Sequence, residues 1–113
     1  MVTLLEGSDV MGAERYLGPV AHVPMGEGRV FLVDGTRVVV FRQRNGRLYA
    51  VQAECPHTGG PLAEGILGSG TLICPLHGWK FNLASGECLN EPRECLKTYA
   101  VREDRGWIVL SEN

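Results

Sequence analysis

One cysteine–histidine pair occurs twice in this 113-residue chain, each time inside a loop rich in proline and glycine. The first pair is Cys55 and His57, and after sixteen further residues the second pair follows as Cys74 and His77. Thiolates suit iron in a cluster with sulfide, whereas imidazoles suit a borderline metal ion. The four residues at this spacing therefore predict a metal centre with mixed ligands, and not four unrelated loop residues.

The sequence around the two pairs resembles that of a known family. The stretch CPHTGGPLAEG contains the first pair and CPLHGWKFNLASGECL the second, and the spacing C-x-H-x16-C-x2-H is similar to that of Rieske iron–sulfur proteins. The resemblance covers about residues 16–110. It implies a [2Fe–2S] cluster as the cofactor, with Cys55 and Cys74 on one iron and His57 and His77 on the other.

A zinc site is the rival interpretation, because two cysteines and two histidines also make a closed tetrahedral zinc centre. Zinc ribbons and fingers usually place two or more residues between neighbouring ligands, so that both side chains reach one ion. The single residue between Cys55 and His57 is tight for that arrangement. It suits two adjacent loops that each give one ligand to each iron. The cluster is therefore favoured, and a zinc-stapled, non-redox β module stays the alternative.

The rest of the chain predicts an all-β fold, because short β-rich runs alternate with turn residues and helix signals are nearly absent. The resemblance implies a Rieske-type β-sandwich or barrel, with a small cluster-binding subdomain formed by the two ligand loops. Asp34-Gly35, between two apolar runs, is a strong signal for a two-residue hairpin turn. The expected strands are 16–22, 28–33, 36–42, 47–52, 71–74, 79–82, 96–102 and 107–110.

The length of the chain predicts one small domain. We expect a flexible tail at 1–13 and a single domain at 14–113, with the ligand loops in an insert at about 53–89. The sequence has no run of 18 apolar residues that could anchor it in a membrane, and residues 1–15 lack the basic leader of a secretory signal. A cytoplasmic protein is therefore expected. The formal net charge of −2, without a basic run, argues against a nucleic-acid partner.

Several positions depart from the high-potential respiratory members of the family. By the resemblance, those proteins have hydroxyl side chains at the positions of Trp79 and Phe81, and a disulfide between the positions of Gly60 and Leu76. Asn82 also stands where an aspartate is common, which removes one carboxylate near the site. Fewer donors to the cluster sulfurs favour a lower reduction potential. The chain therefore resembles the low-potential, soluble ferredoxin branch.

We expect structural roles for the glycines and for the remaining cysteines of this region. Gly78 directly follows His77, and Gly59 and Gly60 come two and three residues after His57; we expect positive φ angles and close backbone approach at these glycines. Cys88 and Cys95 are left over after the cluster takes two thiols. A reducing cytoplasm disfavours a disulfide between them, so both are expected to pack in the core as small apolar residues.

The function that these residues predict is electron transfer, without a catalytic site of the chain's own. A Rieske oxygenase also needs a 2-His-1-carboxylate iron site, and only His22 remains unassigned. The stretches quoted above and LKTYAVRED resemble the small subunit of NAD(P)H nitrite reductase. The ferredoxin component of an aromatic-ring dioxygenase system is the alternative. Both imply redox protein partners: a flavin- or NAD(P)H-linked reductase or a large reductase subunit, or a terminal oxygenase.

Overall fold

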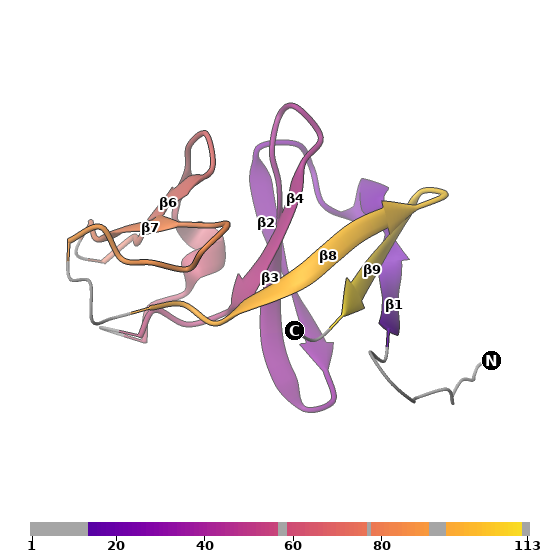
Figure 1. The fold of residues 1–113 in the computed structure, drawn as a ribbon, viewed down its shortest axis with the longest axis horizontal. Helices are drawn as coiled ribbons and strands as arrows, with labels where there is room; N and C mark the ends of the chain where they lie inside the picture. Colours follow the sequence, from indigo (N-terminus) through magenta and orange to yellow (C-terminus); the bar gives the residue numbers. More distant parts are fainter. Residues whose placement is uncertain (1–13, 57–58, 77, 91–94, 112–113) are drawn as a thin grey trace.

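The computed structural model describes residues 14–56, 59–76, 78–90 and 95–111. Within these ranges the chain forms two antiparallel sheets and two 3-10 turns but no α-helix (Figure 1), which confirms the all-β prediction. No helix in the described ranges is long and apolar enough to cross a membrane. The predicted tail at 1–13 lies outside the described residues. The six-stranded sheet has the order β1-β9-β8-β4-β3-β2 and the three-stranded sheet the order β5-β6-β7.

The elements run in chain order as β1 (Glu14–Pro19), η1 (Val20–His22), β2 (Glu27–Val33), β3 (Thr36–Arg42), β4 (Leu48–Gln52), η2 (Leu62–Glu64), β5 (Ile66–Leu67), β6 (Thr71–Ile73), β7 (Lys80–Asn82), β8 (Thr98–Asp104) and β9 (Trp107–Ser111).

Tight turns set the register of the six-stranded sheet. Asp34 and Gly35 have φ angles of 51° and 81°. Positive φ at both central positions is what a type I′ turn requires, and its twist matches that of the flanking strands. Strands β2 and β3 consequently pair along their whole length without a register shift. The predicted hairpin turn is confirmed, and Arg105 and Gly106 join β8 to β9 in the same way.

The first strand is shorter than the predicted run 16–22. Strand β1 ends at Pro19, and Val20–His22 form the 3-10 turn η1. Proline lacks the N–H that would continue a ladder. The N–H of Val23 then donates to the carbonyl of Val20 (3.0 Å), which closes a turn in place of a strand.

The predicted strand 96–102 is shifted toward the C-terminus, because β8 begins at Thr98. The N–H of Leu96 donates to the Gly86 carbonyl (2.7 Å), and the carbonyl of Lys97 accepts from Gln52 (3.0 Å). Leu96 and Lys97 are therefore hydrogen-bonded to the turn after β7 and to the end of β4, and strand β8 begins only after them.

Strand β3 is buried on both faces, which divides the apolar interior into two clusters. Four consecutive residues, Val38 to Phe41, are each at most 1% exposed. Because side chains alternate along a strand, Val39 and Phe41 belong to one cluster, and Val38 and Val40 to the other. The second cluster, the barrel cluster, lies within the six-stranded sheet and includes Ile108 and Leu110. The first, the shared cluster, joins this sheet to the three-stranded sheet and consists of Val39, Phe41, Val51, Cys55, Leu62, Leu72, Cys74, Phe81, Leu83, Cys88 and Leu96.

Two glutamine side chains tie the three-stranded sheet and the ligand loops to the six-stranded sheet. Gln43, only 7% exposed, donates from Nε2 to the carbonyl of Gly68 between β5 and β6 (2.6 Å). Gln52, at the end of β4, donates from Nε2 to the carbonyl of Glu54 (2.7 Å). Its Oε1 accepts from the N–H of Lys97 (2.8 Å). The segments that enter and leave the ligand region are thus fixed to the same side chain.

Candidate metal centre

The first ligand loop, residues 55–60, is closed on its own cysteine. The N–H of Cys55 donates to the carbonyl of Gly60 (2.9 Å), and the N–H of Gly59 donates to the carbonyl of Cys55 (2.7 Å). Both backbone groups of the cysteine are therefore used to hold the loop shut. An antiparallel bridge between Glu54 and Pro61 continues the closure outward.

The second ligand loop, residues 74–79, repeats this closure bond for bond. The N–H of Cys74 donates to the carbonyl of Trp79 (2.8 Å), and the N–H of Gly78 donates to the carbonyl of Cys74 (3.1 Å). In both loops the cysteine is the first residue, the fifth is a glycine, and the sixth residue's carbonyl accepts from the cysteine N–H. In their described residues the two loops thus share the same closure motif, built from different sequences.

The fifth residue of each loop must be glycine for a conformational reason. Gly59 and Gly78 have φ angles of 76° and 72°, which side-chain-bearing residues rarely adopt. A Cβ at either position would meet no atom of the described chain within 4 Å. The requirement is therefore the backbone conformation and not close packing. The prediction of positive φ is confirmed for these two glycines, but it is wrong for Gly60, which instead accepts the hydrogen bond from Cys55.

The two cysteine thiols lie in the shared cluster. Cys55 and Cys74 are each 2% exposed, and neither is in a disulfide. The structure therefore brings these two predicted ligands into one water-excluded region, at the starts of two matching loops. His57 and His77 lie outside the described residues, as do residues 91–94. In the sequence each histidine falls between the cysteine and the glycine of its loop.

The apolar residues beside the second loop have separate roles. Phe81 is fully buried in the same cluster as both cysteines, and Trp79 packs against that cluster while half-buried. Leu76 is 57% exposed. Trp79 is therefore part of the local core, whereas Leu76 faces solvent.

The side chain of Asn82 stabilises the turn that follows β7. Its Oδ1 accepts from the N–H groups of Ala84 (2.9 Å) and Ser85 (3.1 Å), which holds the turn after β7. An aspartate would offer the same acceptor, so the change to asparagine keeps the turn and removes a charge.

The prediction that Cys88 and Cys95 both pack in the core is confirmed for Cys88 and wrong for Cys95. Cys88 is fully buried in the shared cluster, whereas Cys95 is exposed. Glu87 pairs with Cys95 in an isolated antiparallel bridge, and directly opposite residues point to the same face. Cys88, next in the chain, points to the other face, and this arrangement keeps the two thiols apart.

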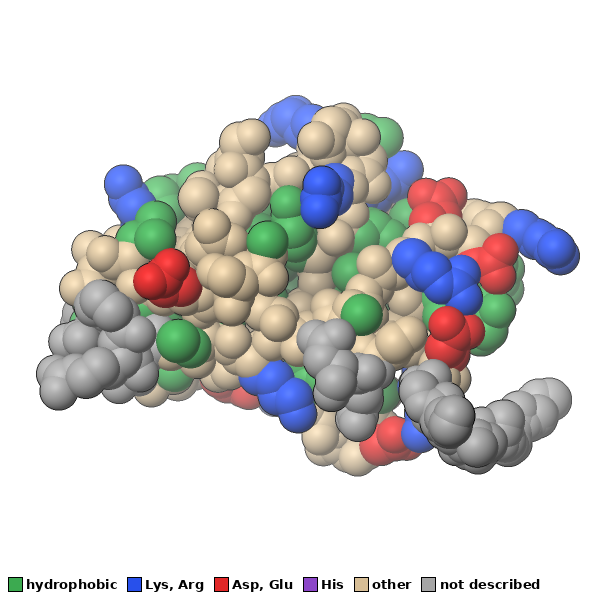
Figure 2. All heavy atoms as spheres, viewed as in Figure 1, with side chains coloured by type: hydrophobic (Ala, Val, Ile, Leu, Met, Phe, Trp, Pro, Cys, Tyr) green, Lys and Arg blue, Asp and Glu red, His purple; other side chains and the backbone are tan. Residues whose placement is uncertain are grey.

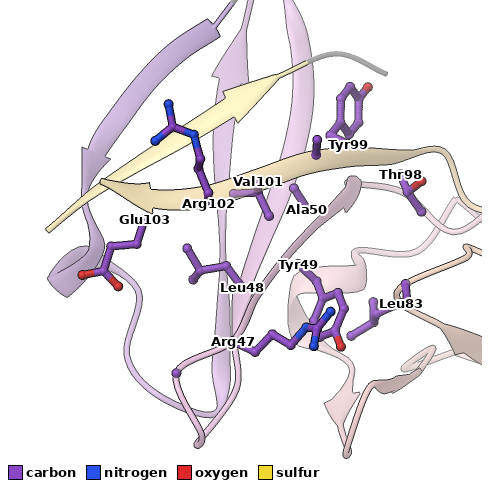
Figure 3. A pocket seen from close by; sticks show the side chains of 13 residues that line it. Arg47, Leu48, Tyr49, Ala50, Leu83, Thr98, Tyr99, Val101, Arg102 and Glu103 are labelled. Atoms are coloured by element: carbon purple, nitrogen blue, oxygen red, sulfur yellow. The ribbon is translucent and has the colours of Figure 1, made fainter. Parts of the chain in front are cut away.

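A shallow groove of about 430 Å³ lies between β4 and β8 (Figure 3). These strands pair at only two positions and then diverge, which leaves the groove between them. Arg47 lies along the ring of Tyr49, with its guanidinium carbon 5.4 Å from the ring centre. The lining contains no cysteine or histidine, and its charged side chains are Arg47, Arg102 and Glu103. The groove therefore offers no rival metal site.

Sequence reasoning missed the two glutamines that anchor the ligand region. Gln43 and Gln52 occupy ordinary positions at strand ends, and no local pattern marks them. The burial of a single polar side chain depends on which distant segment covers it, as Gly68 does for Gln43.

The chain matches the Rieske [2Fe-2S] domain family over residues 14–100, and it therefore belongs to that family. The 4beta-methylsterol monooxygenase of Methylococcus capsulatus is 36% identical over an alignment 87 positions long, which covers 67% of this chain and 23% of that protein. This chain spans about a fifth of the length of the curated relatives it matches.

Solved structures that match include two small proteins along nearly their whole length. A Mycobacterium tuberculosis protein, described as a NADH-dependent nitrite reductase small subunit, has a TM-score of 0.84 at 26% identity. The match covers 92% of this chain and 98% of that one. The ferredoxin of Sphingomonas yanoikuyae B1 has a TM-score of 0.77 at 25% identity, with 88% and 99% covered.

Membership of this family implies a Rieske-type [2Fe–2S] cluster as the cofactor. The described donor atoms fit that group, because two thiols without a disulfide lie in one apolar cluster, and thiolates are the ligands that iron–sulfur clusters take.

Proposed function

We propose that this protein transfers one electron at a time, as a low-potential Rieske protein whose [2Fe–2S] cluster is bound by Cys55, His57, Cys74 and His77. The observation that carries the proposal is the repeated loop closure, which starts each time at a buried thiol. The cluster, when bound, supplies the one-electron uptake and release. The chain holds the ligands in place, and its shared cluster excludes water from the thiols.

The exposed side of the loops is the proposed route for the electron. The cysteines are buried, whereas Gly59, Pro75, Leu76 and Gly78, which flank the histidines in the sequence, are exposed. A partner could therefore approach the described part of the loops from the side opposite the shared cluster. Figure 2 shows that charged side chains of both signs gather at the far end of the molecule, over the β8–β9 turn. The ligand-bearing end displays more scattered charges in this view.

A low reduction potential follows from the residues beside the thiols. Phe81 and Trp79 carry no hydroxyl that could donate to a cluster or ligand sulfur. Such donors stabilise the more negative reduced cluster, so their loss lowers the potential. We expect a midpoint near roughly −150 mV, at the low end of the Rieske range. A donor linked to a flavin or to NAD(P)H could reduce a centre at this potential.

The experiment that tests the function is spectroscopy and voltammetry on the purified holoprotein. Full loading gives the two irons of one cluster per chain, a brown-red colour, and an EPR signal from the reduced protein. A colourless protein that contains zinc would support the non-redox module instead. A midpoint above about +200 mV would contradict the low-potential assignment.

The proposed physiological role is that of a nitrite reductase small subunit in the cytoplasm. The likeness to the Mycobacterium tuberculosis structure supports this role, and the likeness to the Sphingomonas ferredoxin supports the dioxygenase alternative. None of the four cysteines is in a disulfide, which suits a reducing compartment. Anaerobic mixing of the reduced protein with each acceptor from the same organism separates the roles. Reoxidation by the nitrite reductase large subunit supports the first, and reoxidation by a terminal oxygenase supports the second.

A further inference from the structure

The two edge strands of the six-stranded sheet, β1 and β2, are protected to different degrees against pairing with another chain. Strand β1, at one edge, has a register shift between Tyr16 and Gly18 and ends in Pro19. It also begins with two charged residues, Glu14 and Arg15. Bulges, proline and charges are the devices by which proteins stop an edge strand from pairing with another chain.

Strand β2, at the other edge, also carries two charged residues, Glu27 and Arg29, but it has neither a bulge nor a proline. Among the described residues it pairs only with β3, over seven residues and without a register shift. Residues 30–33 are all apolar, and the chain contains no proline within β2. Val30 is 47% exposed and Leu32 is 72% exposed. The β2–β3 hairpin also projects below the other strands in the view of Figure 1. An exposed apolar edge of this kind is a template for another strand.

The hairpin turn decides which backbone groups of β2 face outward. In a two-residue hairpin the residues that flank the turn, here Val33 and Thr36, form a hydrogen-bonded pair. Because such pairs alternate along an antiparallel ladder, the backbone groups of Gly28, Val30 and Leu32 point to the open edge. A side-chain contact is consistent with this orientation: Nη1 of Arg29 donates to the Gly28 carbonyl (2.8 Å), one of the backbone groups that point to the open edge.

We propose that β2 is a homodimer interface, in which the β2 edges of two copies pair antiparallel about a two-fold axis at Phe31. Val30 then lies opposite Leu32 of the second copy, and the outward backbone groups of these two residues complete the ladder. Arg29 of one copy lies alongside Asp34 of the other, and no like charges stand directly opposite. The exposed ion pairs that these residues form within one chain, Arg29–Glu27 and Arg15–Asp34, are weak enough to be exchanged.

This arrangement has a consequence for the ligand regions. Val30 pairs with Val39, so it points to the face of the sheet that the three-stranded sheet covers. A two-fold axis perpendicular to the merged sheet keeps that face in common. The two ligand regions then lie on the same side of the dimer, flanking a strip of Val30 and Leu32 side chains. The inference does not depend on the electron-transfer role.

Sedimentation of the full-length holoprotein over a range of concentrations tests the proposal. We expect a reversible dimer of twice the 12.3 kDa chain mass. Leu32→Lys should raise the dimer dissociation constant at least tenfold, because a cation replaces an apolar contact at the centre of the ladder. Leu89→Lys is the matched control, since Leu89 is 53% exposed on the ligand-bearing side and should leave the constant unchanged. A monomer at every concentration, or equal shifts in the two variants, would overturn the proposal.

A proline variant tests whether the contact is a backbone ladder. Proline is tolerated in an edge strand where the replaced N–H faces solvent. Val30→Pro should therefore keep the circular dichroism and visible spectra of the parent and lose the dimer. A variant that stays dimeric would overturn strand pairing, and one that fails to fold would show that the N–H of Val30 faces β3.

Discussion

The two sheets of this protein are stabilised in different ways. The six-stranded sheet has strands of five to seven residues, two-residue turns and the barrel cluster within it. The three-stranded sheet has strands of only two or three residues, and it shares its apolar cluster with β3 and β4. Isolated strands this short are not stable in water. The ligand loops therefore take their rigidity from the larger sheet, through the shared cluster and the two glutamine amides.

The largest expected difference between the two regions follows from Cys74→Ser. A hydroxyl is a poor ligand for iron in a cluster, so we expect complete loss of the cluster and of its visible absorption. The barrel cluster contains no ligand residue, so amide exchange in β8 and β9 should remain slow. Cys95→Ser is the control, because that side chain is exposed and outside the loops. Full iron content in Cys74→Ser would show that this residue is not a ligand.

Adjacent valines of β3 test whether the two faces of the larger sheet act separately. Val39 and Val40 are both fully buried, but Val39 faces the ligand region and Val40 faces the barrel cluster. Each change to alanine should lower the free energy of unfolding by about 2 kcal/mol. Only Val39→Ala should also speed loss of the iron–sulfur cluster and amide exchange in the three-stranded sheet. Equal rates of cluster loss in both variants would mean that the two regions open as one unit.

Cys88 and Cys95 give a smaller contrast within the ligand-bearing region. Cys88→Ala removes a fully buried sulfur and should lower the free energy of unfolding by about 1–2 kcal/mol. Cys95→Ala changes an exposed side chain and should stay within about 0.5 kcal/mol of the parent. Denaturant unfolding of the holoproteins measures both. The visible spectrum should be the same in each variant, and bleaching in Cys88→Ala would assign that thiol to the cluster.

The smallest expected effect is electronic. Phe81→Tyr adds one hydroxyl beside the ligand thiols, and we expect the midpoint potential to rise by tens of millivolts because that donor favours the reduced cluster. Phe31→Tyr, on the barrel-cluster side of the larger sheet, should leave the potential unchanged. Voltammetry of the two variants separates a local effect on the site from a general one. An unchanged midpoint in Phe81→Tyr would place this ring away from the sulfurs.

Much of the fold could be predicted from the sequence because its signals are local. The turn at Asp34-Gly35 needs positive φ at two adjacent residues, and the sequence supplies the preferred pair for it. The buried run Val38–Phe41 has the continuous apolar character of a strand covered on both faces. The two cysteines could be named as candidate ligands from spacing and from resemblance, and the structure places both in the shared apolar cluster. The ligand roles of Cys55, Cys74, His57 and His77 all stay predictions.

The features that could not be predicted depend on which distant segments meet. Cys88 and Cys95 have similar sequence surroundings, but the isolated bridge between Glu87 and Cys95 puts Cys88 inside and Cys95 outside. Gln43 is buried because Gly68, 25 residues away, covers it. The two-residue strand β5 is too short to show a period, and it exists because β6 lies beside it.

Because both faces of strand β3 are buried, partial unfolding of the protein exposes apolar residues of this strand to water. If the three-stranded sheet detaches, Val39, Phe41 and Val51 become an uncovered apolar strip on two adjacent strands. A strip of this kind is rich in β-branched and aromatic side chains and carries no charge, which are the properties of aggregation-prone segments. Release of the ligand region therefore exposes a self-associating surface in a chain that is otherwise still folded. Loss of the iron–sulfur cluster and precipitation of the protein are therefore expected to be linked, through this strip on β3 and β4.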